Sequence, residues 1–97
     1  MTIEATTWLY VAVQKGGPGE QIVGQTDSEH DISFIPAFLN KESAQQAMFH
    51  LHLDKKKKYE VQAIIYEDLA RHAVENGFLV FVLDDEGKVL ERLPAAP

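Results

Sequence analysis

Three stretches of the chain carry apolar residues at consecutive positions instead of alternate ones. They are residues 8–13, 61–66 and 78–83, and each is rich in β-branched or aromatic side chains, which favour β-strands. Side chains alternate between the two faces of a strand, so an uninterrupted apolar run must be covered on both sides. The pattern therefore predicts three strands that need cover from above and below.

Two segments show helical spacing instead. Residues 41–52 follow Asn40, whose side chain can cap a helix, and they bury one stripe made by Ala44, Ala47, Met48 and Leu51. Residues 67–75 form a second amphipathic segment, which ends at Asn76 and Gly77, a pair typical of a left-handed C-cap.

The remaining strands are shorter. Residues 14–20 contain three glycines and a proline and predict a hairpin tip that leads into a weaker strand at 21–25. A further strand is expected at 32–35, and the turn at 84–87 predicts a hairpin between 78–83 and 88–93.

The order of elements defines the expected fold class. It is βββ-α-β-α-ββ, which predicts a single α+β domain over residues 1–97 with a disordered tail at 94–97. We expect a mixed, largely antiparallel sheet with the two helices packed mainly on one face. Two short helices are roughly enough to cover only one face of such a sheet, so an apolar face is left over.

Composition narrows the possible partners. The formal net charge is −6, whereas binding to nucleic acid normally needs a surplus of Lys and Arg on one surface. The absence of cysteine excludes disulfides, thiolate nucleophiles and cysteine-type metal sites. No segment reaches the roughly 18 apolar residues of a membrane span, and the first residues lack a signal-peptide pattern. We therefore expect a cytoplasmic protein that binds neither nucleic acid nor membrane.

The strand exit and helix start at residues 35–44 carry a pattern shared with a known family. An apolar residue, Pro36 and Phe38 end a strand, and a capped helix opening with Lys41-Glu42-x-Ala44 follows. This arrangement resembles the N-terminal domain of SseB-like proteins, and the similarity covers about half of the chain. The resemblance implies a fold, and it supplies no chemistry for individual residues.

An acidic loop is the first candidate for chemistry. Asp27, Glu29 and Asp31 stand at alternate positions, like the start of a calcium loop, but Ile32 and Phe38 occupy the positions where an EF-hand needs Gly and Glu. A solvated loop explains the pattern better than weak binding of a divalent ion.

The second candidate is the sequence His50-x-His52-x-Asp54. Alternate positions share one face of a strand, but they diverge on a helix, where these residues are expected. Histidines near the negative end of a helix dipole are a simpler explanation than a metal site. No nucleophile motif accompanies any histidine, so we expect no metal, no cofactor and no catalytic residue.

The Lys55, Lys56, Lys57 and Lys58 run is a concentrated positive charge in an acidic protein. Such a run is either a solvated turn or a docking point for an acidic partner or a second copy of the chain.

Trp8 and Tyr10 share one side of the first strand, opposite Leu9 and Val11. Trp and Tyr are favoured where a surface is buried only in a complex. The alternatives are that the sheet curls and buries both faces itself, or that the Gly-rich loop covers these aromatic side chains.

The leading hypothesis is a non-catalytic protein-interaction module that forms a homo-oligomer or binds another protein through Trp8, Tyr10, Lys55, Lys56 and Lys57. The alternative is a small ligand-binding domain or enzyme with a pocket between the sheet and the loops near Gly16 and Asp27.

Overall fold

Strands and helices follow one another in the predicted order. The computed structural model of the protein describes residues 3–17, 19–51 and 53–93. The elements are β1 (Trp8–Gly17), β2 (Gly19–Ile22), β3 (Gln25–Asp27), β4 (Ile32–Ala37), α1 (Lys41–Ala47), β5 (Lys58–Ile65), α2 (Tyr66–Asn76), β6 (Leu79–Leu83) and β7 (Val89–Leu93). This confirms the α+β class and the order, with β3 as an additional short strand. The expected disordered tail, residues 94–97, lies outside the described residues.

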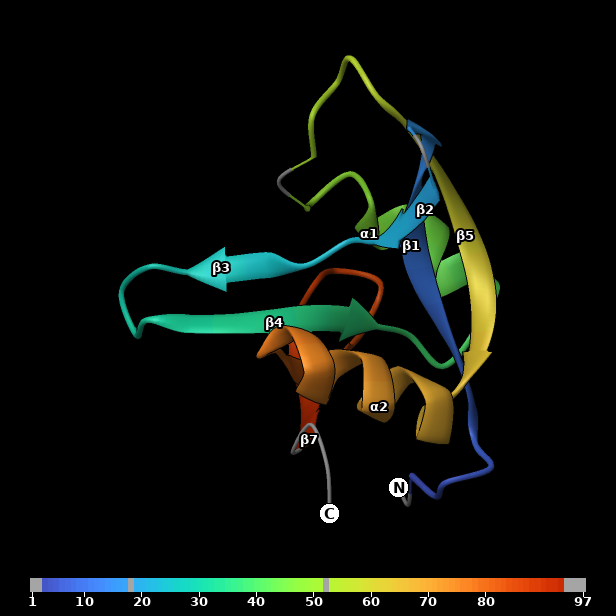
Figure 1. The fold of residues 1–97 in the computed structure, drawn as a ribbon, viewed down its shortest axis with the longest axis vertical. Helices are drawn as coiled ribbons and strands as arrows, with labels where there is room; N and C mark the ends of the chain where they lie inside the picture. Colours follow the sequence, from blue (N-terminus) through green and yellow to red (C-terminus); the bar gives the residue numbers. More distant parts are fainter. Residues whose placement is uncertain (1–2, 18, 52, 94–97) are drawn as a thin grey trace.

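The strands form two sheets (Figure 1). One has the order β2-β1-β5 and is antiparallel, and the other has the order β3-β4-β6-β7 with β4 and β6 parallel. Among the described residues, an isolated bridge between Tyr10 and Phe38 connects them. The apolar runs expected to share one sheet are therefore divided between two.

The Gly-rich segment is part of a hairpin, as predicted, but it is more regular than expected. β1 and β2 continue to the register pair Gly17 and Gly19, and the register shifts between Gln14 and Gly17. Gly16 has φ 90° and Gly19 has φ 134°, conformations that side chains other than glycine rarely adopt. Glycine therefore lets the ladder extend where the sequence predicted only a flexible tip.

Helix α1 is shorter than the predicted helix at 41–52. Asn40 caps it as expected, because its Oδ1 accepts a hydrogen bond from the Ser43 amide at 2.8 Å. Ala44 and Ala47 are buried, but Phe49, which follows the helix, is 89% exposed. Short helices depend on tertiary packing, and beyond Ala47 the chain turns instead of extending the helix.

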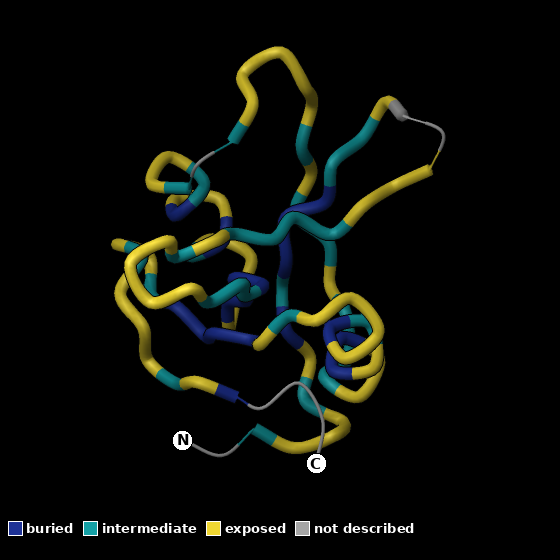
Figure 2. Tube along the Cα trace, turned by 60° about the vertical axis from the view of Figure 1, so that its left-hand side comes forward, coloured by how far each residue is buried: buried dark blue, intermediate teal, exposed yellow. Residues whose placement is uncertain are grey.

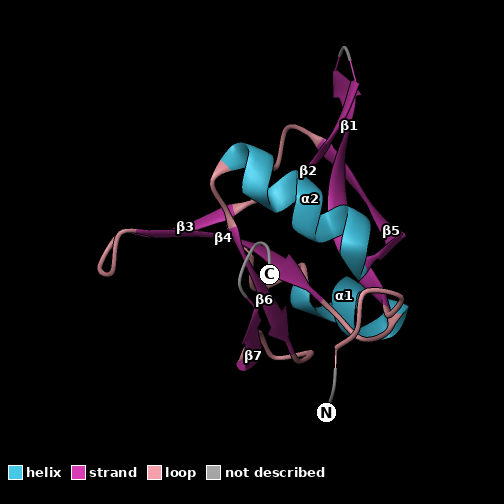
Figure 3. Cartoon of the chain, turned by 60° about the horizontal axis from the view of Figure 1, so that its bottom comes forward, coloured by secondary structure: helices cyan, strands magenta, loops and turns pink. Residues whose placement is uncertain are grey.

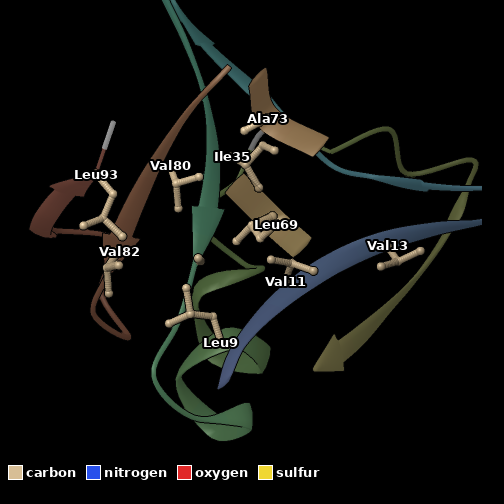
Figure 4. Packing of buried hydrophobic residues seen from close by; sticks show 10 residues of the cluster. Leu9, Val11, Val13, Ile35, Leu69, Ala73, Val80, Val82 and Leu93 are labelled. Atoms are coloured by element: carbon tan, nitrogen blue, oxygen red, sulfur yellow. The ribbon is translucent and has the colours of Figure 1, made fainter. Parts of the chain in front are cut away.

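Two clusters of buried side chains lie on opposite faces of the strands. The first contains Leu9 and Val11 of β1, Val80 of β6, and Leu69 and Ala73 of α2. Figure 4 shows these side chains meeting between the sheets and α2. Figure 2 shows that the buried stretches gather in the middle of the molecule, while the hairpin ends are exposed.

The second cluster contains Phe38, Ala44 and Ala47 around α1, with Phe81 and Leu83 of β6. Phe81 alternates with Val80 along β6, so the two clusters occupy opposite faces. The expectation that both helices pack mainly on one face is therefore not met: α2 covers one face and α1 the other. Figure 1 shows the two helices apart, with α1 behind β1 and β5, and Figure 3 shows the same elements from another side. Less apolar sheet surface is therefore left without a covering helix than the sequence predicts.

Candidate interaction surface

Strand β5 is an edge of its sheet within the part of the chain that the structure describes. It pairs with β1 along eight register positions, from Trp8 opposite Ile65 to Lys15 opposite Lys58. No described strand pairs with its other side. An edge strand of this length presents unpaired backbone groups that can pair with another chain.

The hydrogen bonds of β1 determine which backbone groups face this edge. Tyr10 exchanges backbone hydrogen bonds with Phe38, and the Ala12 carbonyl accepts one from the Val23 amide, so both residues direct their backbone groups away from β5. In an antiparallel ladder, the partner residues across such a pair also direct theirs outward. These partners are Ala63 and Val61.

Tyr59 lies two residues before Val61, and its backbone amide and carbonyl therefore also face away from β1. The β5 edge therefore offers the amides and carbonyls of Tyr59, Val61 and Ala63 to a further strand. The side chains of these residues lie on the face of the sheet that α1 covers, because Val61 packs against the second cluster.

A groove of mixed polar and apolar lining borders this edge, between α1 and β5. Its volume is about 520 Å³, and it is lined by Lys41, Gln45, Met48, Phe49, Leu53, Tyr59, Glu60 and Val61. We call it the edge groove. Lys41, Gln45 and Met48 lie on one side of α1, at helical spacing. The Phe49 side chain, which forms part of its lining, is almost fully exposed.

The two aromatic residues predicted to face a partner are placed differently. Trp8 is 59% exposed at the start of β1, opposite Ile65. Tyr10 is half-buried and packs against the second cluster. The Tyr10 side chain is therefore part of the packing around the core, whereas the Trp8 side chain is accessible to a partner.

The lysine run lies at the beginning of β5. Lys55, Lys56 and Lys57 are exposed, and Lys56 and Lys57 line a hollow of about 390 Å³ with Lys15, Gly16, Gln14 and Lys58. Lys15 forms ion pairs with Glu20 and, at 3.4 Å, with Glu60. The hydrogen bond that the Lys15 ammonium donates to the Glu20 carboxylate raises the pKa of Lys15.

Opposite charge lies at the other end of β5. Glu67 and Asp68 are exposed in the first turn of α2. Arg71 approaches them at 3.8 and 3.5 Å, and all three side chains are more than half exposed. Such surface pairs contribute little to stability and do not hold the carboxylates firmly.

A separate hollow of about 290 Å³ lies at the acidic loop near Asp27 and shares no lining residue with the hollow at Gly16. It is lined by Asp27, His30, Ile32, Leu79, Phe81, Arg92 and Leu93. Asp27 Oδ2 lies 2.9 Å from His30 Nδ1, and this hydrogen bond lowers the pKa of Asp27. The guanidinium of Arg92 lies 5.6 Å from the centre of the Phe81 ring.

The metal-ligand patterns of the sequence are only partly brought together. Ligand atoms of Asp27, Glu29 and His30 lie within 4.8 Å of one another at the exposed loop. Asp54 instead shapes a turn, since its Oδ1 accepts from the Lys56 amide at 2.9 Å. His50 is exposed, and His52 lies outside the described residues.

The sequence did not identify the edge groove. Its apolar lining includes Met48 and Val61, which the sequence places in the buried stripe of a helix and in an apolar strand, and Phe49, to which the sequence gives no role. Phe49, an aromatic residue off the apolar stripe of its predicted helix, was the one available signal.

Comparisons with known protein families, with curated proteins and with solved structures found no match for this chain. Within the described residues, neither helix has the length and apolar character needed to cross a bilayer.

Proposed function

We propose that this protein is a non-catalytic interaction module that self-associates through the free edge of β5 and the edge groove beside it. The observation that carries the proposal is the coincidence of both features on the same residues. Tyr59 and Val61 direct backbone groups to the edge, and the same two residues line the groove. An added strand would thus gain main-chain hydrogen bonds and a site for an apolar side chain together.

The exposed apolar residues support this position. Trp8 and Phe49 are the two most exposed large apolar side chains among the described residues. Trp8 lies opposite one end of β5, and Phe49 lines the groove beside the other. Aromatic side chains at the border of a groove are typical anchors of protein interfaces. In this proposal the protein acts in the cytoplasm and its partner is protein, not nucleic acid or membrane.

A proline at the edge tests this proposal. The Ala63 amide faces the edge, so Ala63→Pro removes a donor needed only for an added strand, and edge positions of this kind tolerate proline. Analytical ultracentrifugation over micromolar concentrations should show a dimer for the wild type and a monomer for Ala63→Pro, with the far-ultraviolet circular dichroism retained.

Gln62→Pro is the matched control, because the Gln62 amide faces β1 and its loss breaks the existing ladder. It should lower the free energy of unfolding by about 3 kcal/mol or more, clearly more than Ala63→Pro. A wild type that stays monomeric throughout, or an Ala63→Pro variant that dimerises as the wild type does, would show that the proposal is wrong.

The second candidate function is binding of a small ligand in the hollow near Asp27. The observation in its favour is that Asp27, His30 and Arg92 line the same hollow, with the Arg92 guanidinium over the Phe81 ring. A small aromatic carboxylate fits this chemistry, with its ring on the apolar lining and its charge on Arg92. Benzoate titration followed by NMR should then shift the signals of these residues, and Arg92→Gln should abolish the shifts. Unchanged spectra at millimolar benzoate would contradict this candidate.

A further inference from the structure

We propose that the partner at the β5 edge is a second copy of the chain, paired antiparallel about a two-fold axis at Gln62. This inference rests on the proposed function, and it adds the orientation, the register and the charged residues that select them. The carrying observation is the opposite charge at the two ends of β5. Lys56 and Lys57 precede the strand, and Glu67 and Asp68 follow it.

Such a strand is complementary to itself in one orientation only. When two copies run antiparallel, the basic start of each strand lies beside the acidic end of the other. In a parallel arrangement, lysines would face lysines and carboxylates would face carboxylates, which is unfavourable. The charge distribution therefore selects the two-fold, self-complementary dimer common among homo-oligomers.

The register follows from the same charges. Outward positions must face one another, so Val61 of one copy can pair with Ala63 of the other, which places Gln62 opposite Gln62. This register places the first turn of α2, which carries Glu67 and Asp68, beside the turn of the second copy that carries Lys56 and Lys57.

This register also gives the exposed Trp8 a position at the interface. Tyr59 of one copy lies opposite Ile65 of the other, and Ile65 is the β1 neighbour of Trp8. Trp8 of the second copy therefore lies one strand away from Tyr59, on the face that carries the edge groove. Its burial there would remove a large exposed aromatic surface from water.

Charge reversal tests the orientation. One double variant carries Lys56→Glu and Lys57→Glu, and the other carries Glu67→Lys and Asp68→Lys. Each alone should weaken self-association at least about tenfold, because both contacts of its dimer become repulsive. Mixed in equal amounts, they should form a heterodimer, visible by native mass spectrometry, because both contacts are attractive again. The control for net charge compares two single variants, Lys57→Glu and Lys88→Glu, which change the charge equally. Lys88 is exposed and lies outside β5, so only Lys57→Glu should weaken self-association.

A single cysteine tests the register, and the chain has no other cysteine to confuse the result. Gln62→Cys should give a disulfide-linked dimer on mild oxidation, since directly opposed residues of a non-hydrogen-bonded pair have Cβ atoms about 4.5–5.5 Å apart. Glu60→Cys is the control on the same face. Its two copies would be offset by four residues, about 13 Å, and should not cross-link.

The outcomes separate the two proposals. If Ala63→Pro abolishes the dimer but the charge variants associate as the wild type does, the β5 edge is the interface and the antiparallel arrangement is wrong. Efficient cross-linking of Glu60→Cys with none at Gln62→Cys would likewise reject the register. A monomeric wild type, in contrast, would reject the proposed function itself.

Discussion

Tyr10 and Phe38 exchange two backbone hydrogen bonds, at 2.8 and 2.9 Å, and form the bridge that joins the two sheets. The same pair orients the backbone of Tyr10 away from β5 and thereby leaves Ala63 facing the free edge. The Phe38 side chain is fully buried beneath α1, next to the half-buried Tyr10. The bridge therefore lies at the second cluster, and its hydrogen bonds determine which backbone groups of β5 face away from β1.

Two phenylalanines near α1 should respond oppositely to truncation. Phe38→Ala should lower the free energy of unfolding by about 3–5 kcal/mol, because it empties a fully buried site. Phe49→Ala should change it by no more than about 0.5 kcal/mol, because the side chain is 89% exposed. Urea denaturation of the monomer measures both values. Similar losses for the two variants would contradict this assignment of core and surface.

Trp8→Ala should weaken association and leave the fold intact. We expect a loss of about 2 kcal/mol in the free energy of dimerisation, typical of an aromatic anchor. The monomer should unfold at nearly the wild-type urea concentration. If Trp8 is core instead, the truncation should cost about 3–5 kcal/mol of folding stability with no change in the dimer dissociation constant.

Gly24→Ala should destabilise the protein, because a Cβ at this position would lie 2.8 Å from Cε1 of Phe78. The ring must then shift, at a cost of about 1–3 kcal/mol by thermal or urea unfolding. In a Phe78→Leu background the same substitution should cost less, since the ring that causes the clash is gone. An equal loss of stability in both backgrounds would show that the Phe78 ring does not cause the destabilisation.

Asp27 should titrate below its ordinary pKa of 3.8, because His30 donates to its carboxylate. A group whose pKa is lowered by folding stabilises the native state above its unfolded pKa, and this contribution is lost as the pH falls through the folded pKa. NMR titration of the Asp27 side chain should show the lowered midpoint, and His30→Ala should raise it. A midpoint unaffected by His30→Ala would contradict the pairing.

Local patterns determined the elements of this protein. Consecutive apolar residues predicted β1, β5 and β6, and Asn40 and Gly77 predicted the start of α1 and the end of α2. These signals involve only residues near one another in the chain, so the sequence contains them directly. The lysine run and the exposed Trp8 could be located by the same means.

Only the tertiary structure decided how the faces are covered. Whether α1 lies on the same side as α2, and whether β5 is central or an edge, depends on pairings between distant segments such as Tyr10 and Phe38. No local preference specifies these pairings, because an apolar strand face can pack against any apolar surface of complementary shape. Helix α1 ends at Ala47 for the same reason, since helical spacing continues in the sequence where tertiary packing does not. The edge groove between α1 and β5 forms only where these long-range contacts place the helix beside the strand, and it therefore could not be predicted from the chain alone.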